Sequence, residues 1–190
     1  MTASIGNSVF EASVLEKFDF LVKSGYSIAI QDPTLITFTR RNILVDVYHG
    51  RRSEEIGIGL TVDDERFSLS ELIRLNDEKL AEVFRNPLAR DEAEIRQGVS
   101  KVAELLLNFG CKALEGDGAF LSALTTQRQA RSLSYELDVL ADQTRPLAEQ
   151  AFRVGEYAEA AKLYARMSER LTRAEKAKLR LAKARSATRH

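Results

Sequence analysis

The spacing of apolar residues changes from two to about 3.6 near Ser68, and this change constrains the fold more than any other feature of the chain. Between residues 26 and 62 apolar and polar residues alternate, as in strands that bury one face. After Ser68 apolar residues recur every three or four positions, as on one side of a helix, and no strand is expected there. The sequence therefore predicts an α+β fold in which a sheet is followed by helices.

Four strands are expected in the first part of the chain. The segments 26–31, 34–39, 43–49 and 56–62 carry alternating or β-branched apolar residues. Because short links join consecutive strands as hairpins, we expect an antiparallel four-stranded meander. A helix over residues 9–22, with apolar residues four, four and three positions apart, is expected to pack on the apolar face of this sheet.

The apolar positions of these strands and of the N-terminal helix predict a common core. Residues on the inward side of the third and fourth strands alternate without interruption, and the helix presents a matching stripe. We therefore expect the following side chains to be buried together: Val45, Val47, Ile56, Ile58, Leu60, Phe18 and Leu21.

Capping residues divide the second part of the chain into helices. Ser68 is followed three positions later by glutamate, and so is Asp91, which is typical of a helix N-terminus. Asp77 is expected to cap a further short helix. We expect Gly110 to end the helix that Asp91 opens, and Pro146 to start a new one. This organisation predicts an α+β domain over residues 1–115 and a helical region over residues 116–190.

The segment 147–183 resembles a tetratricopeptide hairpin. Small residues recur at positions that let two antiparallel helices approach, Gly155 suits the tight turn, and Tyr157 and Tyr164 are placed to fill the space between the helices. The resemblance covers one repeat and the start of a second, whereas an array needs about three repeats to form a groove. The hairpin is therefore interpreted either as a binding groove or as a structural cap.

Charge is distributed unevenly along a chain that is neutral as a whole, with 28 basic and 28 acidic residues. Residues 166–190 hold nine basic and two acidic residues, a net charge of +7. Such a segment is either a contact surface for an anionic partner or a solvated helix end, where cations interact favourably with the helix dipole. A nucleic-acid-associated accessory protein that uses these helices is thus an alternative function.

Features of secreted and membrane proteins are not expected. The N-terminal segment lacks the basic and apolar regions of a signal peptide, and no apolar run approaches the ~20 residues of a membrane span. The single cysteine, Cys111, permits no disulfide within the chain and is expected to be a small buried apolar residue. These observations favour a protein of the reducing cytoplasm.

Motifs of catalysis are absent from the sequence. With only two histidines and one cysteine, no metal-ligand spacing can be found, and neither a Gly-rich phosphate loop nor a Gly-x-Ser-x-Gly motif is present. Asp46, Glu54 and Glu55 are similar to the acids of a metal-dependent nuclease, but Gly57 stands where such a site needs a lysine. We therefore expect a protein that is not an enzyme and has no cofactor or metal.

The turn between the third and fourth strands gathers the residue types that bind partners. It joins aromatic, imidazole, guanidinium and carboxylate groups in eight positions, and loops on rigid scaffolds often carry function. The candidate partner-binding residues in and beside it are Asp46, Tyr48, His49, Arg51, Arg52, Glu54, Glu55 and Gly57. The alternative is a surface hairpin whose charges pair with one another.

Two glycines lie on one face of the fourth strand, next to this turn. Gly57 and Gly59 weaken a strand interior, so their position needs a reason. One interpretation is a strip without side chains, beside Asp46 and Tyr48, that a partner approaches closely. The other is internal packing or a β-bulge.

A helix, a meander with a Val-Tyr-His-Gly-Arg-Arg turn and a helical tail is similar in layout to small uncharacterised bacterial cytosolic proteins. Among these are immunity-like proteins encoded beside secreted toxins. The resemblance covers residues 9–110. It implies a non-enzymatic protein-interaction module that binds and blocks a protein partner, and this is the leading functional expectation.

Overall fold

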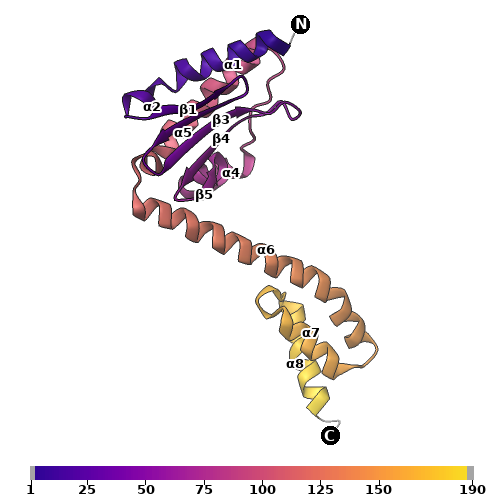
Figure 1. Ribbon diagram of the computed structural model, residues 1–190. Coiled ribbons are helices and arrows are strands. Elements are labelled where there is room, and N and C mark those ends of the chain that lie inside the picture. Colours follow the sequence, from indigo (N-terminus) through magenta and orange to yellow (C-terminus); the bar gives the residue numbers. More distant parts are fainter. Residues whose placement is uncertain (1–2, 188–190) are drawn as a thin grey trace. The chain divides into compact units, whose positions relative to one another are not determined.

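The structure is a computed structural model that describes the backbone of residues 3–187 and the side chains of residues 9–187. Two compact units comprise residues 1–127 and 128–190 (Figure 1). Helices and strands follow in the order α1 (Ala3–Lys17), α2 (Asp19–Lys23), β1 (Ser27–Asp32), β2 (Leu35–Arg40), β3 (Ile43–His49), β4 (Ile56–Val62), β5 (Glu65–Ser68), α3 (Leu69–Asn76), α4 (Glu78–Val83), α5 (Glu92–Glu115), α6 (Gly118–Arg153), α7 (Tyr157–Arg166), a 3-10 turn (Ser168–Arg170) and α8 (Arg173–Ala187).

The sheet is antiparallel, as expected, but it has five strands instead of four. Its strands lie side by side in chain order, from β1 to β5. The additional strand, β5, pairs with β4 across a two-residue turn at Asp63 and Asp64, whose φ angles are 45° and 70°. A turn with positive φ at both residues matches the twist of a β-hairpin, so these two acidic residues return the chain to the sheet.

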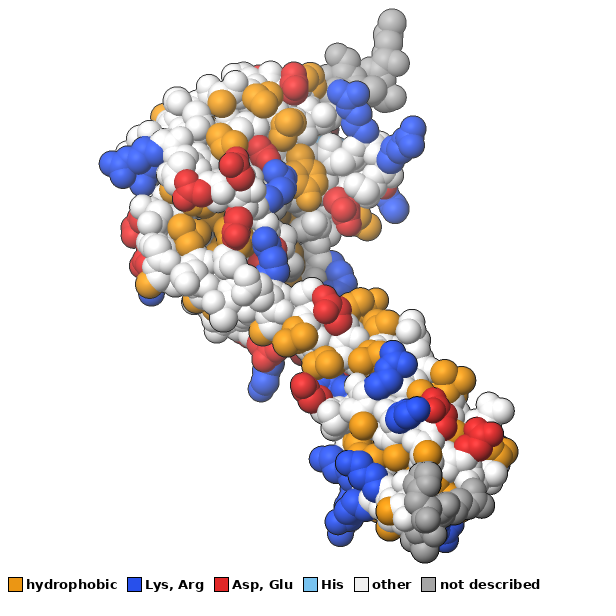
Figure 2. Space-filling view, turned by 60° about the horizontal axis from the view of Figure 1, so that its bottom comes forward, with side chains coloured by type: hydrophobic (Ala, Val, Ile, Leu, Met, Phe, Trp, Pro, Cys, Tyr) orange, Lys and Arg blue, Asp and Glu red, His pale blue; other side chains and the backbone are white. Residues whose placement is uncertain are grey.

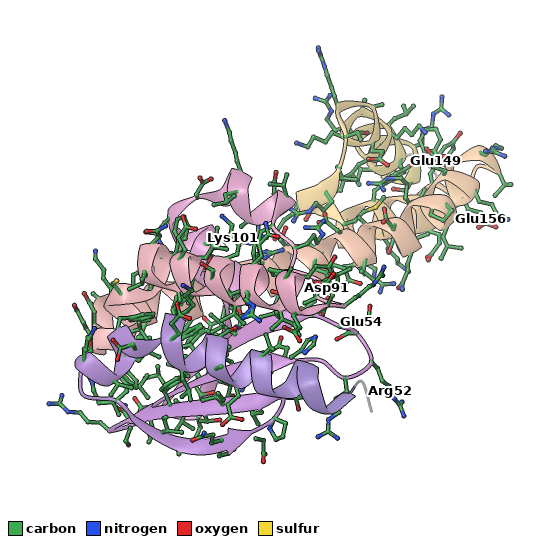
Figure 3. All side chains as sticks on the ribbon, turned by 90° about the horizontal axis from the view of Figure 1, so that it is seen from above. Arg52, Glu54, Asp91, Lys101, Glu149 and Glu156 are labelled. Atoms are coloured by element: carbon green, nitrogen blue, oxygen red, sulfur yellow. The ribbon has the colours of Figure 1, made fainter. Side chains whose placement is uncertain are left out.

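The predicted core is confirmed. All seven residues expected to be buried together belong to one cluster, and none is more than 4% exposed. The N-terminal helix contacts β2, as expected, but it shares the covering of the sheet with α5, which packs along α1 and contacts β4. α1 and α5 lie next to each other in Figures 1 and 3. The apolar face of the sheet is therefore closed by two helices from distant parts of the sequence.

Helix boundaries differ from the expectation near Phe18 and near Gly110. The expected helix over residues 9–22 is interrupted at Phe18, which separates α1 from α2. Gly110 lies inside α5, and the helix ends at Gly116, whose φ is 79°. Gly110 is buried where a side chain would press on Leu106 and Leu72, so it serves close packing and not termination.

Pro146 does not begin a helix, because α6 continues through it. Its neighbours on the helix, Ala141, Ala148 and Ala151, are buried in the core of the second unit. Packing on both sides of the proline holds the helix together although one backbone hydrogen bond is lost.

The expected environment of Cys111 is wrong, because this residue is exposed. Its neighbours Gly110, Ala113 and Leu114 form the buried side of α5, so Cys111 faces outward. The thiol donates a hydrogen bond to the carbonyl of Leu107, with 2.7 Å between the sulfur and the oxygen.

The second unit consists of the end of α6 together with α7 and α8. A small core of alanines surrounds Tyr164, which is fully buried, and α7 packs against α8. Gly155, with φ of 82°, lies between α6 and α7, where a turn was expected. The first unit extends to residue 127, beyond the boundary expected at residue 115, since Phe120, Leu121 and Leu124 of α6 belong to the core of the first unit.

Candidate interaction site at the turn between β3 and β4

The turn between β3 and β4 is closed by its own backbone. The amide of Gly50 donates to the carbonyl of Glu55, and the amide of Glu54 donates to the carbonyl of Gly50, both at 2.8 Å. Glu54 has a φ of 56°, in the left-handed region that non-glycine residues seldom adopt. The surrounding contacts must therefore hold Glu54 in this conformation.

The segment that precedes α5 supplies these contacts. The amide of Ile56 donates to the carbonyl of Pro87, and the amide of Ala89 donates to the carbonyl of Glu54, again at 2.8 Å. Glu55 and Leu88 form a β-bridge between the two segments. Four backbone hydrogen bonds thus hold the turn on both sides, which gives it a defined position on the sheet.

A surface ion pair adds to the attachment of the turn. The Nε of Arg90 donates to a carboxylate oxygen of Glu54 at 2.8 Å. This hydrogen bond is the largest contribution that raises the pKa of Arg90 above its ordinary value. Both side chains are well exposed, so the pair contributes little to stability.

Arg51 and Arg52 are exposed at the tip of the turn. Neither makes a hydrogen bond, an ion pair or a ring contact with any residue that the structure describes. Figure 3 shows Arg52 pointing away from the ribbon. Two adjacent guanidinium groups on a held turn are suited to carboxylate or phosphate groups, which arginine binds through paired hydrogen bonds.

The ring of His49 contacts α1 and the segment before α5. It stacks on Phe10, with 5.8 Å between the ring centroids. The Nε2 atom lies 3.0 Å from the carbonyl of Ala89, and since a carbonyl only accepts, Nε2 carries the proton. His49 therefore joins α1, β3 and the segment before α5.

The strip without side chains, one of the two interpretations of Gly57 and Gly59, is not present in the structure. Tyr48 places its ring over Gly57, and Arg66 of β5 places its guanidinium over Gly59. Arg66 also pairs with Asp46, which accepts a further hydrogen bond from Thr37 at 2.8 Å. The two glycines thus make room for side chains of this chain, as the alternative interpretation of internal packing held.

The structure therefore divides the predicted site residues into three groups. Asp46, Tyr48 and Gly57 pack within the sheet, and His49 packs beneath the turn. Glu54 and Glu55 attach the turn to the segment 87–89. Of the eight predicted residues, Arg51 and Arg52 are the two most exposed, and neither has a side-chain partner among the described residues.

The sequence reasoning missed the segment around Pro87 and Arg90 as part of this site. Thirty-six residues separate Glu54 from Arg90, and no periodicity links them. The only signal was Asn86-Pro87, which indicates an extended stretch between helices and hence a strand-like partner for the turn.

Clusters of potential metal ligands and apolar helices of membrane-spanning length do not occur among the residues that the structure describes. Among them no group of three or more histidine, cysteine or acidic residues lies close enough to hold a metal ion. Within the same part of the chain, no helix combines the length and the apolar character that crossing a membrane requires.

Comparisons with known proteins assign the chain to no family. No protein-family model matches the chain, and neither the curated proteins nor the solved structures include a match.

Proposed function

We propose that this protein is a non-enzymatic interaction module of the cytoplasm whose turn between β3 and β4 binds an acidic surface of a protein partner. One observation carries the proposal: Arg51 and Arg52 are exposed and unpaired on a turn that four backbone hydrogen bonds hold in place. A surface that is ordered before binding loses less conformational entropy when the partner arrives.

The charge of the tip indicates the chemistry of the partner. Two adjacent cations repel each other and gain most from anionic groups, and arginine is among the residues enriched at the centres of interfaces. The resemblance to immunity proteins favours one kind of partner, a toxin whose surface the turn would block. The tetratricopeptide-like hairpin is, in this proposal, a structural cap of the second unit.

Affinity capture from the native cell tests the proposal. The full chain serves as one bait, and the chain with both Arg51→Glu and Arg52→Glu serves as the other. We expect a protein partner that the first bait retains and the second does not. A partner retained equally by both baits would show that this turn is not the interface.

The matched control is Arg41→Glu. Arg41 is also exposed in a tight turn, at the other end of β3, and its φ of 55° makes its backbone similar to that of the candidate turn. The same reversal of charge at this position is expected to leave capture unchanged. Loss of the partner in the control as well would point to overall charge instead of the turn between β3 and β4.

A further inference from the structure

The basic residues of α8 lie on two distinct faces. On the inner face, Lys178 pairs with Glu149 at 3.0 Å, and Arg185 lies over the ring of Tyr157, 4.9 Å from its centroid. The only acid of the helix, Glu175, is buried and pairs with Arg145 at 2.7 Å. The charged side chains of the inner face therefore have their partners within the second unit.

The outer face carries four cations with no counterpart. Arg173, Lys176, Arg180 and Lys183 follow one another at intervals of three, four and three residues, which places them in one row along the helix. All four are exposed, and within the described part of the chain none makes an ion pair or a hydrogen bond through its side chain. We call these four residues the cationic row.

The cationic row has an electrostatic cost. Like charges three or four positions apart on a helix destabilise it by roughly 0.2–0.5 kcal/mol per pair. No acid on this face offsets the repulsion, because Glu175 faces the core. The row is therefore a surface whose energy falls when a polyanion binds to it.

We propose that the cationic row binds the phosphate backbone of nucleic acid without preference for sequence. The row extends over eleven residues, from Arg173 to Lys183, or about 15 Å along the helix axis, so its members can contact several consecutive phosphates. No aromatic residue lies within α8 to stack on bases. Contacts to phosphate alone position a protein on nucleic acid but carry no sequence information.

The alternatives to nucleic acid fit the helix less well. A helix that lies on a membrane inserts a broad apolar face, whereas Leu179 and Ala182 already pack in the core of the second unit. A protein interface would place aromatic or large apolar anchors among the cations. Between Arg173 and Lys183 the one large apolar side chain that is exposed is Leu181, at 42%.

The distribution of charge indicates that nucleic acid is attracted to the second unit and not to the first. Residues 128–190 hold 14 basic and eight acidic residues, a net charge of +6, and residues 1–127 hold 14 and 20, a net charge of −6. Figure 2 shows Lys and Arg side chains gathered at one side of the second unit. This inference is independent of the proposed turn, which lies in the first unit.

Fluorescence anisotropy with the full chain and a labelled duplex of ~20 base pairs tests the inference. At physiological salt we expect a dissociation constant on the order of 10⁻⁶–10⁻⁴ M, which an unrelated duplex sequence reproduces. Between about 50 and 200 mM salt, the logarithm of the association constant should fall with a slope no steeper than about −3.6, since four phosphate contacts each contribute about −0.9.

Matched double variants separate this surface from the first unit. Arg173→Gln with Arg180→Gln should make the slope shallower by about 1.8, since two phosphate contacts are lost. Arg51→Gln with Arg52→Gln removes two equally free arginines and should leave the slope unchanged. Melting temperatures of both variants report whether they are folded.

Three results would overturn the inference. The first is an unchanged slope in the folded Arg173→Gln, Arg180→Gln variant. The second is an equal change in the Arg51→Gln, Arg52→Gln control. The third is tighter binding to phosphatidylserine vesicles than to the duplex, lost in the first variant, which would assign the cationic row to a membrane surface.

Discussion

The side chains of Tyr48 and Arg66 explain why glycine occupies two positions of β4. A Cβ atom on Gly57 would overlap the ring of Tyr48, and one on Gly59 would overlap the guanidinium of Arg66. The glycines are therefore required by side chains of neighbouring strands. Period-two patterning predicted that these positions share a face, but it could not predict which side chains cover them, because that depends on strand register and on β5.

The contact between Tyr48 and Gly57 leads to the first prediction. We expect Gly57→Ala to destabilise the first unit, because the new methyl group must displace the ring. In a Tyr48→Ala background the same substitution should cost much less, so the two effects should not be additive. Urea unfolding of the four proteins in this double-mutant cycle measures the coupling. Additive effects would mean that the ring does not cover the glycine.

The core leads to the second prediction. Ile58 is 4% exposed among the side chains that α1 and α5 cover, so Ile58→Ala should lower the free energy of unfolding by about 2–5 kcal/mol. Leu44 lies on β3 with its side chain toward the other face and is 38% exposed. Leu44→Ala is therefore the control, with an expected loss below about 1 kcal/mol. Equal losses in the two variants would contradict the assignment of the buried face.

At the scale of elements, capping residues were sufficient to predict the starts of α3, α4 and α5, whereas the start expected at Pro146 was wrong. The capping box predicted at Ser68 with Glu71 is present, and Asp91 caps α5 as expected. Thr172 and Glu175 exchange the same pair of hydrogen bonds at the start of α8. These motifs depend on residues only three positions apart, so the sequence determines them without knowledge of the fold.

Elements whose boundaries depend on tertiary packing were not predicted. β5 requires β4 as a partner, and α5 passes through Gly110 because the glycine packs closely there. All residues of β1 are exposed despite its apolar Ile28 and Ile30, because it is an edge strand with an irregular register. The hydrogen bond from the amide of Ile56 to the carbonyl of Pro87 was not predicted either, because Asn86-Pro87 indicates an extended stretch but not what it pairs with.

The capping box of α3 gives the third prediction. The side chain of Ser68 accepts from the amide of Glu71, and the carboxylate of Glu71 accepts from the amide of Ser68. Ser68→Ala should therefore cost about 0.5–2 kcal/mol. Ser100→Ala, on the exposed side of α5, is the control and should be neutral or slightly stabilising, since alanine is the better helix former. Thermal unfolding that does not distinguish the two variants would contradict the role of the box.

Glu175 gives the fourth prediction, on pH. Burial raises its pKa, but hydrogen bonds from the backbone and side chain of Thr172 and from Arg145 outweigh this, and the net pKa lies below the ordinary value of 4.5. A lowered carboxyl pKa in the folded state contributes stability that is present above pH 4.5 and is lost as the pH falls through the folded pKa.

Acidification from about pH 5 to pH 3 should therefore lower the melting temperature of the second unit more in the natural chain than in Glu175→Gln, which has no proton to gain at this position. The difference between the two proteins removes the contribution of other carboxylates. Parallel curves for the two proteins would show that Glu175 has the same pKa folded and unfolded.

At the scale of the whole molecule, the α+β class and the change from sheet to helices were predictable, because they follow from periodicity alone. The division into units 1–127 and 128–190 follows instead from which side chains of α6 each core uses. Between residues 128 and 140 of α6 no side chain is buried.

This exposed stretch gives the fifth prediction. Backbone amides of residues 128–140 should exchange hydrogen faster than those of α5, whose buried side chains include Val99, Val102 and Leu106. Few buried contacts mean a low free energy of local opening. Hydrogen exchange followed by mass spectrometry measures the difference, and equal protection in both helices would show that another surface covers the stretch.

The central claim, that the turn between β3 and β4 is an interface, is tested most directly by titrating the captured partner against four proteins. These are the natural chain, Arg51→Glu, Arg52→Glu and the control Arg41→Glu, each with its melting temperature. We predict affinity at least about tenfold weaker for at least one of the two turn variants, with unchanged melting and an unaffected control. Unchanged affinity in both turn variants would contradict the claim, and so would a loss of affinity that accompanies unfolding.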